Sequence, residues 1–499
     1  MSYSEYVSRL RKIADVAYAS AVLSWDQETY MPEQGASRRA SQLSTLSGIV
    51  HEMATDPKYG ELLKQLNADE SLDEIRKSNI YHSLKNYNRA TKLSVGFVEE
   101  LSRSISEAFN AWQEAKTKND FSIFAPKLKK LVELKRKECE LIGYREHPYD
   151  ALLDEYEPGL TTAKTDQLFN EVRKKLVPFV QKIFNAPRPE IKFLGKHYPK
   201  QQQWDFSIDI LKKMGYDFTA GRQDISMHPF TINFGSKDVR VTTRVDENNL
   251  SDCVTGTIHE GGHALYEQGL SDENYGLPAG EAVSLGVHES QSRVWENNIG
   301  RSLEFWKGIL PLARHYFPEQ LKDAVAEDFF RELNVVEPSL IRINADELTY
   351  HFHIMIRFEV EKALFENKLE VDDIPSFWNR KYKEYLGIDV PSDAEGCMQD
   401  VHWSHGSFGY FPTYSIGSFM AAQFFSAACR DIPGLEQQIE QGNYTSFLNW
   451  LREKIHRHGK RWLADDLCEK VTGEKLQFSY FMEYARKKYS KLYPAINNM

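Results

Sequence analysis

The stretch ISMHPFTINFGSKDVRVTTRVDENNLSDCVTGTIHEGGHALYEQGL, residues 225–270, is the most informative part of this chain for its fold. Residues 225–235 and then 236–245 carry β-branched residues in short alternation around a Gly-Ser-Lys-Asp turn, which predicts a hairpin. Residues 252–270 place apolar side chains on several sides of one helix, so we expect that helix to be buried. The pattern therefore predicts a small β-sheet beside a buried helix.

The rest of the chain predicts amphipathic helices, because apolar residues recur at spacings of three and four. The clearest are residues 71–92, 94–118, 121–142, 161–184 and 337–367. Breaks fall at residues 185–191, 276–280 and 390–396. We expect an all-α, predominantly helical fold of two lobes that share one groove. All 499 residues are predicted to form one domain, with an N-terminal helical part of about 1–190 and a second part of about 191–499 that contains residues 225–270.

Composition narrows the class of protein. The net charge is −10, from 62 Lys and Arg against 72 Asp and Glu, which argues against nucleic acid or an anionic membrane as a partner. No stretch reaches the roughly 18 consecutive apolar residues of a membrane span. The five cysteines are scattered, and the N-terminus lacks the apolar core of a signal peptide. We therefore expect a soluble protein of the reducing cytoplasm.

The motif HEGGH at residues 259–263 predicts a metal site. Residues four apart lie on one face of a helix, so His259 and His263 can both direct a ring nitrogen at one zinc ion. Glu260 stands beside them, where it can take a proton from water as a general base. Gly261 and Gly262 each cost about 1 kcal/mol against alanine in a helix, so we expect a ligand or another strand to approach this helix backbone closely.

A catalytic zinc site needs a third protein ligand and one open position. The next predicted helix, within residues 280–300, offers four candidates. They are Glu281, His288, Glu289 and Glu296. Spacing alone leaves all four open.

Several motifs resemble those of the carboxypeptidase Taq family of metallopeptidases, and the resemblance covers nearly the whole chain. They are HPF at 228–230, DVRVT at 238–242, HEGGH at 259–263, HESQ at 288–291, IRINAD at 341–346 and GCMQDVHW at 396–403, together with the segment from Trp25 that begins WDQETYMPEQGASRR. This resemblance implies Glu289 as the third ligand, zinc or cobalt as the metal, and a helical fold with a small sheet beside a deep groove. It also implies a homodimer that removes single residues from peptide C-termini with broad specificity.

A carboxypeptidase must bind its substrate's terminal carboxylate, and the planar fork of an arginine suits that group. Arg342 is the first candidate, because the resemblance places IRINAD at the active groove. Arg240, Arg244 and Arg357 are rivals. An oxyanion donor is expected among His402, His405, Tyr410 and Tyr414.

Other polar residues have weaker assignments. Asp346 and Glu347 are candidates for orienting a zinc-bound histidine. His351 and His353 are predicted to be structural. His228 either lines the groove or holds the hairpin in place.

Three alternatives remain at this point. The first is an oligopeptidase or dipeptidyl carboxypeptidase on the same scaffold. The second is an aminopeptidase, which would need acidic groups for the substrate amine. The third is a helical binding protein whose metal only stabilises the fold.

Overall fold

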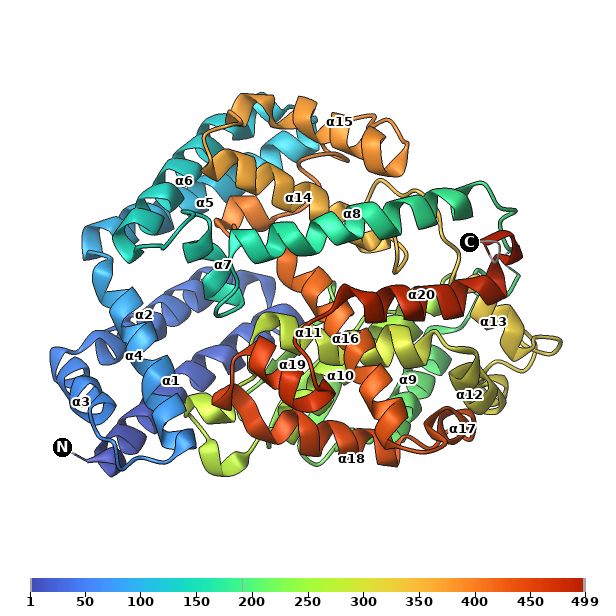
Figure 1. Ribbon diagram of the computed structural model, residues 1–499, viewed down its shortest axis with the longest axis horizontal. Helices are drawn as coiled ribbons and strands as arrows, with labels where there is room; N and C mark the ends of the chain where they lie inside the picture. The colour runs from blue at the N-terminus through green and yellow to red at the C-terminus, as the bar shows by residue number, and fades with distance from the viewer. Residues whose placement is uncertain (1, 191, 497–499) are drawn as a thin grey trace. The chain divides into compact units, whose positions relative to one another are not determined.

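The computed structural model describes residues 2–190 and 192–496, which contain 20 α-helices and one three-stranded sheet (Figure 1). The prediction of a predominantly helical fold with a small sheet is confirmed. None of the helices in this part of the chain has both the length and the hydropathy to cross a bilayer.

The chain divides into two compact units. Unit 1 consists of Met1–Ala90, Pro189–Leu333 and Met420–Gln477, and unit 2 consists of Thr91–Arg188, Asn334–Phe419 and Phe478–Met499. The chain therefore passes between the units several times, and one passage lies close to the division predicted near residue 190. The assignment of all 499 residues to one catalytic domain stays a prediction.

Unit 1 contains the sheet and most of the helices. Its helices are α1 (Tyr3–Thr29), α2 (Ala36–Thr55), α3 (Pro57–Asn67), α4 (Glu74–Lys92), α9 (Lys200–Met214), α10 (Leu250–Gly269), α11 (Leu285–Arg293), α12 (Leu303–Tyr316), α13 (Ala326–Glu332), α17 (Leu435–Glu440), α18 (Thr445–Lys454) and α19 (Ala464–Thr472). A π-helical segment, η4 (Val294–Gly300), continues α11. Trp306 of α12 stacks on Phe329 of α13 at 4.0 Å in the core of this unit.

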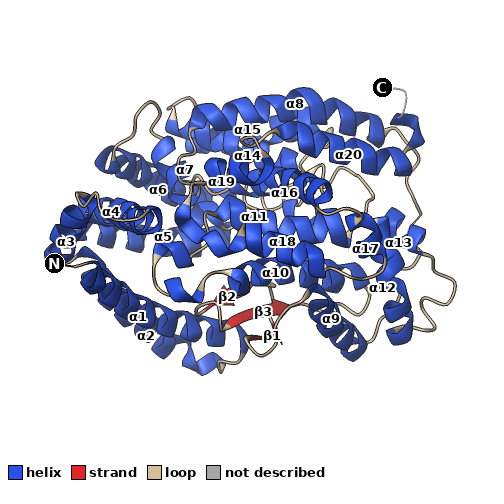
Figure 2. Ribbon diagram, turned by 60° about the horizontal axis from the view of Figure 1, so that its bottom comes forward, coloured by secondary structure: helices blue, strands red, loops and turns tan. Residues whose placement is uncertain are grey.

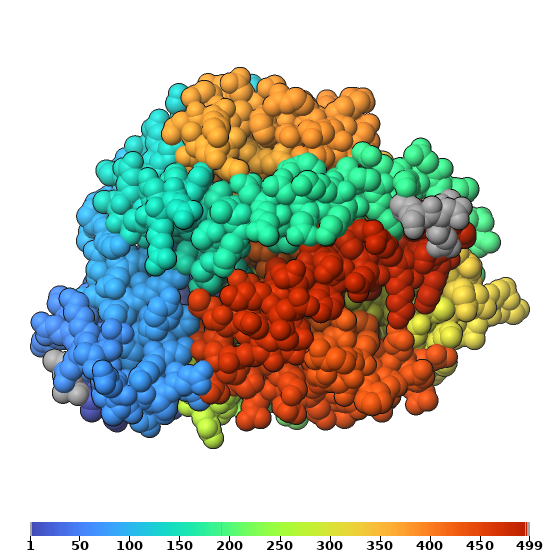
Figure 3. All heavy atoms as spheres, viewed as in Figure 1, coloured from blue at the N-terminus to red at the C-terminus, as the bar shows by residue number. Residues whose placement is uncertain are grey.

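Unit 2 is built from long helices. They are α5 (Val95–Lys118), α6 (Phe121–Ile142), α7 (Asp150–Tyr156), α8 (Thr162–Phe184), α14 (Tyr350–Phe365), α15 (Ile374–Leu386) and α20 (Phe478–Leu492), and α16 (Pro412–Asp431) begins in this unit and ends in unit 1. α5 and α6 pack against each other, as do α8 and α20. Both α8 and α20 reach the surface shown in Figure 3.

Four of the five helices predicted by range are found within a few residues of their predicted ends. The fifth prediction, 337–367, is wrong in its first part, because α14 begins only at Tyr350. Residues 347–349 form a turn before the helix, in which the Asp346 carboxylate accepts from the backbone N–H groups of Leu348 and Thr349 at 2.9 and 3.1 Å. The IRINAD motif therefore lies in a loop with one short 3₁₀ turn, Arg342–Asn344.

The predicted hairpin is present, but it belongs to a larger sheet. β2 (Thr231–Asn233) pairs antiparallel with β3 (Val239–Thr243) across the predicted turn, where Gly235 has a φ of +108°. β1 (Gly221–Ile225) pairs parallel with the other side of β3. Within the first half of the predicted hairpin, the strand begins only at Thr231, and residues 226–230 form the connection between β1 and β2.

The sheet lies beside α10, as Figure 2 shows, and α10 packs against β3, α9 and α11. Twelve residues of α10 are buried. Asn249 begins α10 by accepting from the N–H of Asp252, and Ser284 begins α11 by accepting from the N–H of Val287. The predicted placement of the sheet beside the HEGGH helix is therefore confirmed.

Candidate metal centre

Two histidines of α10 and one carboxylate of α11 lie together in unit 1. The Nε2 atoms of His259 and His263 lie 3.7 and 3.4 Å from Oε2 of Glu289. Ligands about 2.0–2.1 Å from a tetrahedral ion are about 3.3 Å from one another. The three donor atoms therefore fit one such ion, and no other group of this kind occurs within residues 2–190 and 192–496.

Close packing of α11 on α10 positions these donors. A Cβ atom on Gly262 would lie 2.6 Å from the carbonyl oxygen of Gln291 and 2.7 Å from Cα of Ser292. A Cβ on Gly261 would instead meet the side chains of Leu211 and Met214 of α9. The expectation of a close approach to these glycines is confirmed, but the approaching groups belong to helices α9 and α11 and not to a strand; the glycine at 262 lets the backbones of α10 and α11 touch.

The other ring nitrogen of His259 donates to a second carboxylate. Nδ1 of His259 lies 2.8 Å from Oε2 of Glu296 in η4. Arg301 donates to Oε1 of Glu296 at 2.8 Å, and Arg293 donates to Oε2 at 3.0 Å. This carboxylate–histidine pair fixes the tautomer that leaves Nε2 free to bind a metal.

Asp346 and Glu347, the residues predicted for this orienting role, have other partners. Asp346 accepts from the N–H of Thr349 in the turn before α14, and Glu347 accepts from the hydroxyls of Tyr484 and Tyr489 at 2.9 and 2.8 Å. The role of Glu296 was missed, although it lies seven residues after Glu289 and therefore on the same face of a helix.

The other candidates for the third ligand also have partners of their own. Glu281 pairs with Lys460 at 2.5 Å. His288 donates to Glu267 at 2.8 Å, and its ring stacks on that of His263 at 4.4 Å. Of the four acidic or histidine candidates, only Glu289 directs a carboxylate oxygen at both Nε2 atoms.

Glu260 is buried next to these histidines. Its Oε2 accepts from the hydroxyl of Thr231 in β2 at 2.7 Å. Burial raises the pKa of the Glu260 carboxyl, and His259 and the Thr231 hydroxyl oppose that rise. A carboxylate with a raised pKa is a better proton acceptor. No feature of the sequence pointed to Thr231.

Arg342 lies in unit 2, where it forms part of a buried charge cluster. Its Nε and Nη2 donate to Oδ1 of Asp400 at 3.1 and 2.9 Å, and its Nη1 donates to the hydroxyl of Tyr350 at 3.0 Å. Arg357 donates to the other oxygen of Asp400 at 2.6 Å. Two guanidinium groups thus share one carboxylate, which leaves one positive charge in the cluster.

The remaining rival arginines belong to unit 1. Arg240 forms a two-pronged pair with Asp238 and lies 4.4 Å above the ring of Trp25. Arg244 pairs with Asp252 in an exposed position. Both pairs balance the charge of the arginine.

Three of the predicted substrate-binding residues form an aromatic group in unit 2. His402 Nε2 shares a hydrogen bond with the hydroxyl of Tyr414 at 3.3 Å, and the ring of Tyr410 lies 5.3 Å from His402 and 5.2 Å from Tyr414. Burial lowers the pKa of His402 to about 3. His402 is therefore neutral at ordinary pH and can donate one hydrogen bond without carrying a charge.

His228 is exposed in the connection between β1 and β2, and its carbonyl accepts from the hydroxyl of Ser226 at 2.6 Å. His351 and His353, predicted to be structural, are fully buried and bond to Ser415 and Tyr382 at 3.0 and 2.9 Å.

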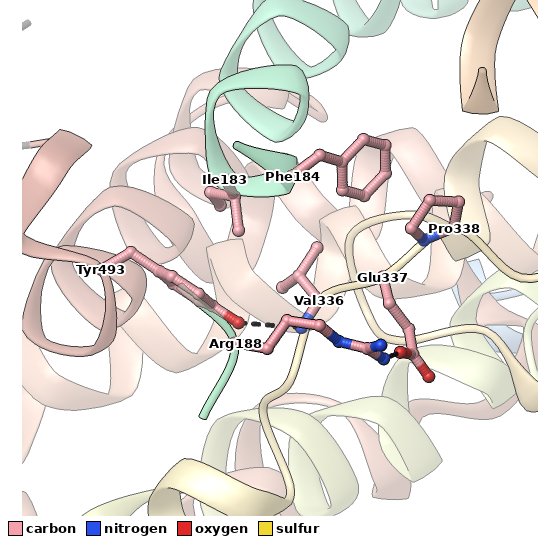
Figure 4. A pocket seen from close by; sticks show the side chains of 7 residues that line it. All are labelled: Ile183, Phe184, Arg188, Val336, Glu337, Pro338 and Tyr493. Carbon is pink, nitrogen blue, oxygen red and sulfur yellow. Dashed lines mark hydrogen bonds and ion pairs between the residues drawn. The ribbon is translucent and has the colours of Figure 1, made fainter. Parts of the chain in front are cut away.

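A small cavity in unit 2 contains none of the predicted site residues. It is lined by Ile183, Phe184, Arg188, Val336, Glu337, Pro338 and Tyr493 (Figure 4). The Tyr493 hydroxyl accepts from the N–H of Val336, and Arg188 pairs with Glu337.

The geometry of His259, His263, Glu289 and Glu260 defines a metallohydrolase of the HExxH class. The chain matches the family described as carboxypeptidase Taq (M32) metallopeptidase over residues 5–489, and it belongs to that family. It is 41% identical to "Carboxypeptidase 1" of Bacillus subtilis over 98% of each chain, and 41% identical to "Thermostable carboxypeptidase 1" of Thermus thermophilus over 99% of each. The crystal structure of the M32 carboxypeptidase from Deinococcus radiodurans superimposes with a TM-score of 0.96, at 39% identity over 99% of both chains.

The chain is therefore a metallocarboxypeptidase that acts on peptides with a divalent metal. The resemblance inferred from its motifs is confirmed. The aminopeptidase and binding-protein alternatives are wrong.

Proposed function

We propose that this metallocarboxypeptidase binds zinc through His259, His263 and Glu289 and removes single residues from peptide C-termini with broad specificity. The observation that carries the proposal is the position of Glu260, which is buried beside the three ligands and held by Thr231. The bound zinc supplies Lewis-acid polarisation of the scissile carbonyl and of a water molecule. Glu260 takes the proton from that water at its carboxylate and passes it to the leaving amine.

The edge of the sheet offers the substrate backbone a place to bind. β2 is the outer strand beside β3 in the described part of the chain. The N–H of Phe234 donates to the carbonyl oxygen of Asp238, just before β3, and the carbonyl oxygen of Phe230 accepts from the N–H of Thr242 in β3. The backbone groups of Thr231 and Asn233 therefore point away from β3. An extended peptide added along this edge would lie next to the strand that holds Glu260. A peptide complex in which no strand pairs with β2 would contradict this role.

The terminal carboxylate is assigned to Arg342. The surplus positive charge of Arg342 and Arg357 over Asp400 supports this assignment, since it favours an added anion. We expect R342M to lower kcat/KM by about 100-fold or more on peptides with a free C-terminus. R244M removes an exposed arginine and serves as the control; an equal loss in both variants would contradict the assignment.

The donors to the developing oxyanion are assigned to Tyr410, Tyr414 and His402, and a further substrate contact to His228. The neutral state of His402 supports its use as a hydrogen-bond donor. Replacing each tyrosine with phenylalanine should lower kcat more than it raises KM, because an oxyanion contact strengthens in the transition state.

Three further assignments complete the proposal. Cobalt can replace zinc, since the same nitrogen and oxygen ligands suit both ions. The enzyme is a homodimer, which sedimentation equilibrium would test. It works in the cytoplasm, and the five free cysteines of the structure are consistent with a reducing compartment.

The first experiment compares one peptide with a free and with an amidated C-terminus, using zinc-loaded protein and product masses. Stepwise loss of single residues from the free form alone supports the proposal. Loss of two residues at a time would favour the dipeptidyl carboxypeptidase alternative. E260Q should keep one equivalent of metal and lose about 10²–10⁴-fold in kcat, and near-native turnover of E260Q would contradict the role of Glu260.

A further inference from the structure

Glu289, Arg293 and Glu296 form one stripe along α11 and η4. They are spaced at i, i+4 and i+7, so a helical backbone brings all three side chains to the face that meets α10. All three are largely enclosed, with side-chain exposures of 10, 15 and 7%. Arg293 lies between the two carboxylates and donates to both of them.

The two oxygens of Glu289 have different partners. Oε2 faces the Nε2 atoms of His259 and His263. Oε1 accepts a short hydrogen bond of 2.6 Å from Nε of Arg293. That bond uses one of the two lone pairs of Oε1 and fixes the orientation of the carboxylate, so it opposes binding of one metal through both oxygens.

We propose that Arg293 is a positioning residue that limits Glu289 to one metal bond, through Oε2, and so keeps a coordination position open for the reaction. The inference rests on the metal site proposed above and goes beyond it, because it assigns a function to a residue that binds neither metal nor substrate. A carboxylate without this bond can bind a divalent ion through both oxygens, as carboxylates do at other metal sites. The second oxygen would then occupy the open position that catalysis requires.

The position of Arg293 distinguishes it from the other groups around Glu289. Arg301 donates to Oε1 of Glu296 at 2.8 Å and to the carbonyl oxygen of Leu333 at 3.0 Å. The Ser292 hydroxyl donates to the carbonyl oxygen of Glu289 at 2.7 Å and lies 3.1 Å from Oε2, the oxygen assigned to the metal. Among these groups, only Arg293 holds Oε1.

Arg301 therefore supplies a matched control. R293M and R301M each remove one positive charge from the same cluster, but only R293M releases Oε1 of Glu289. A change caused by lost charge alone would appear in both variants. A change caused by the freed oxygen would appear in R293M only.

The test uses the full-length protein loaded with one equivalent of Co²⁺, whose visible absorption weakens as its coordination number rises. We expect R293M to absorb roughly half as strongly per bound cobalt as the wild type or less, and R301M to keep the wild-type spectrum. R293M should also lose about 10- to 100-fold in kcat at full metal loading. R293M with a wild-type spectrum, or R301M with the same change as R293M, would overturn the inference.

A second measurement needs no variant and covers the case in which R293M does not fold. A crystal structure of the zinc-loaded wild type shows how many oxygen atoms of Glu289 bind the metal. One bound carboxylate oxygen supports the inference, and two would overturn it. Failure of the wild type to bind one equivalent of either metal would overturn the proposed metal site itself, and the inference with it.

Discussion

Replacement of Gly262 with alanine tests whether the contact between α10 and α11 sets the metal centre. The added Cβ would lie 2.6 Å from the carbonyl oxygen of Gln291, whereas an ordinary contact needs at least 3.4 Å. The two helices would have to move apart by about 0.8 Å, which exceeds the roughly 0.5 Å within which site residues must be held. Glu289 moves with α11, while His259 and His263 stay on α10.

We expect the G262A variant to lose about 100-fold in kcat/KM, the cost of a misplacement of this size. Overpacking costs about 1–3 kcal/mol, and alanine returns about 1 kcal/mol of helix propensity. The net loss of stability is therefore about 0–2 kcal/mol, too small to unfold the protein. Zinc affinity measured by competition with a chelator, together with thermal unfolding of the metal-free form, separates the two effects.

Alanine at Gly261 is the matched control. Its Cβ meets the ends of the Leu211 and Met214 side chains, at 2.7 and 3.0 Å, and no backbone atom. Flexible side chains can move away, so G261A should keep wild-type zinc affinity within about threefold. Equal zinc affinity and activity in G262A and the wild type would refute the reasoning, as would an equal loss in G261A and G262A.

Two further predictions concern single hydrogen bonds and buried charge. T231V removes the hydroxyl bound to Glu260 and should lower kcat by about 10-fold or more without changing metal content, because a hydrogen bond to a charged group contributes about 1.5–3 kcal/mol. T231S keeps a hydroxyl and should restore most of the rate. A wild-type kcat in T231V would contradict the role of Thr231 in holding Glu260. Burial lowers the pKa of His456 to about 3. The folded state therefore binds fewer protons than the unfolded state between about pH 3 and 6.5. The free energy of unfolding falls as the pH drops through that window, by up to about 1.4 kcal/mol per pH unit. H456Q should therefore show a weaker dependence of its unfolding temperature on pH between 4.5 and 6.5 than the wild type. Parallel curves for the wild type and H456Q would contradict the prediction.

Structural elements whose pattern repeats within a few residues could be predicted from the sequence. Helical periodicity located α4, α5, α6 and α8 within a few residues, because burial of one helix face requires apolar side chains at regular spacing. The HEGGH spacing placed two histidines and a glutamate on one helix for the same reason. The turn at Gly235 marked the hairpin, since a residue at positive φ in a tight turn is usually glycine.

Elements that depend on partners far along the chain were missed or misplaced. β1 pairs with β3 in parallel, so no turn links the two strands and no local signal joins them. α14 was predicted to begin thirteen residues too early, because the apolar pattern continues through a segment whose backbone bonds instead to Asp346.

The proposed metal centre likewise combines residues that one helix brings together with residues that only the packing of helices brings together. The sequence by itself determined His259, Glu260 and His263, which one turn of helix brings together. It left the third ligand open among four residues, and only the resemblance to a family selected Glu289. Tertiary structure decided the rest: Gly262 lets α11 approach α10, and that approach brings the donor atoms of Glu289 within reach of both histidines. The contacts of Glu296, Arg293 and Thr231 also depend on elements packed side by side, and helix periodicity describes only what happens within one element.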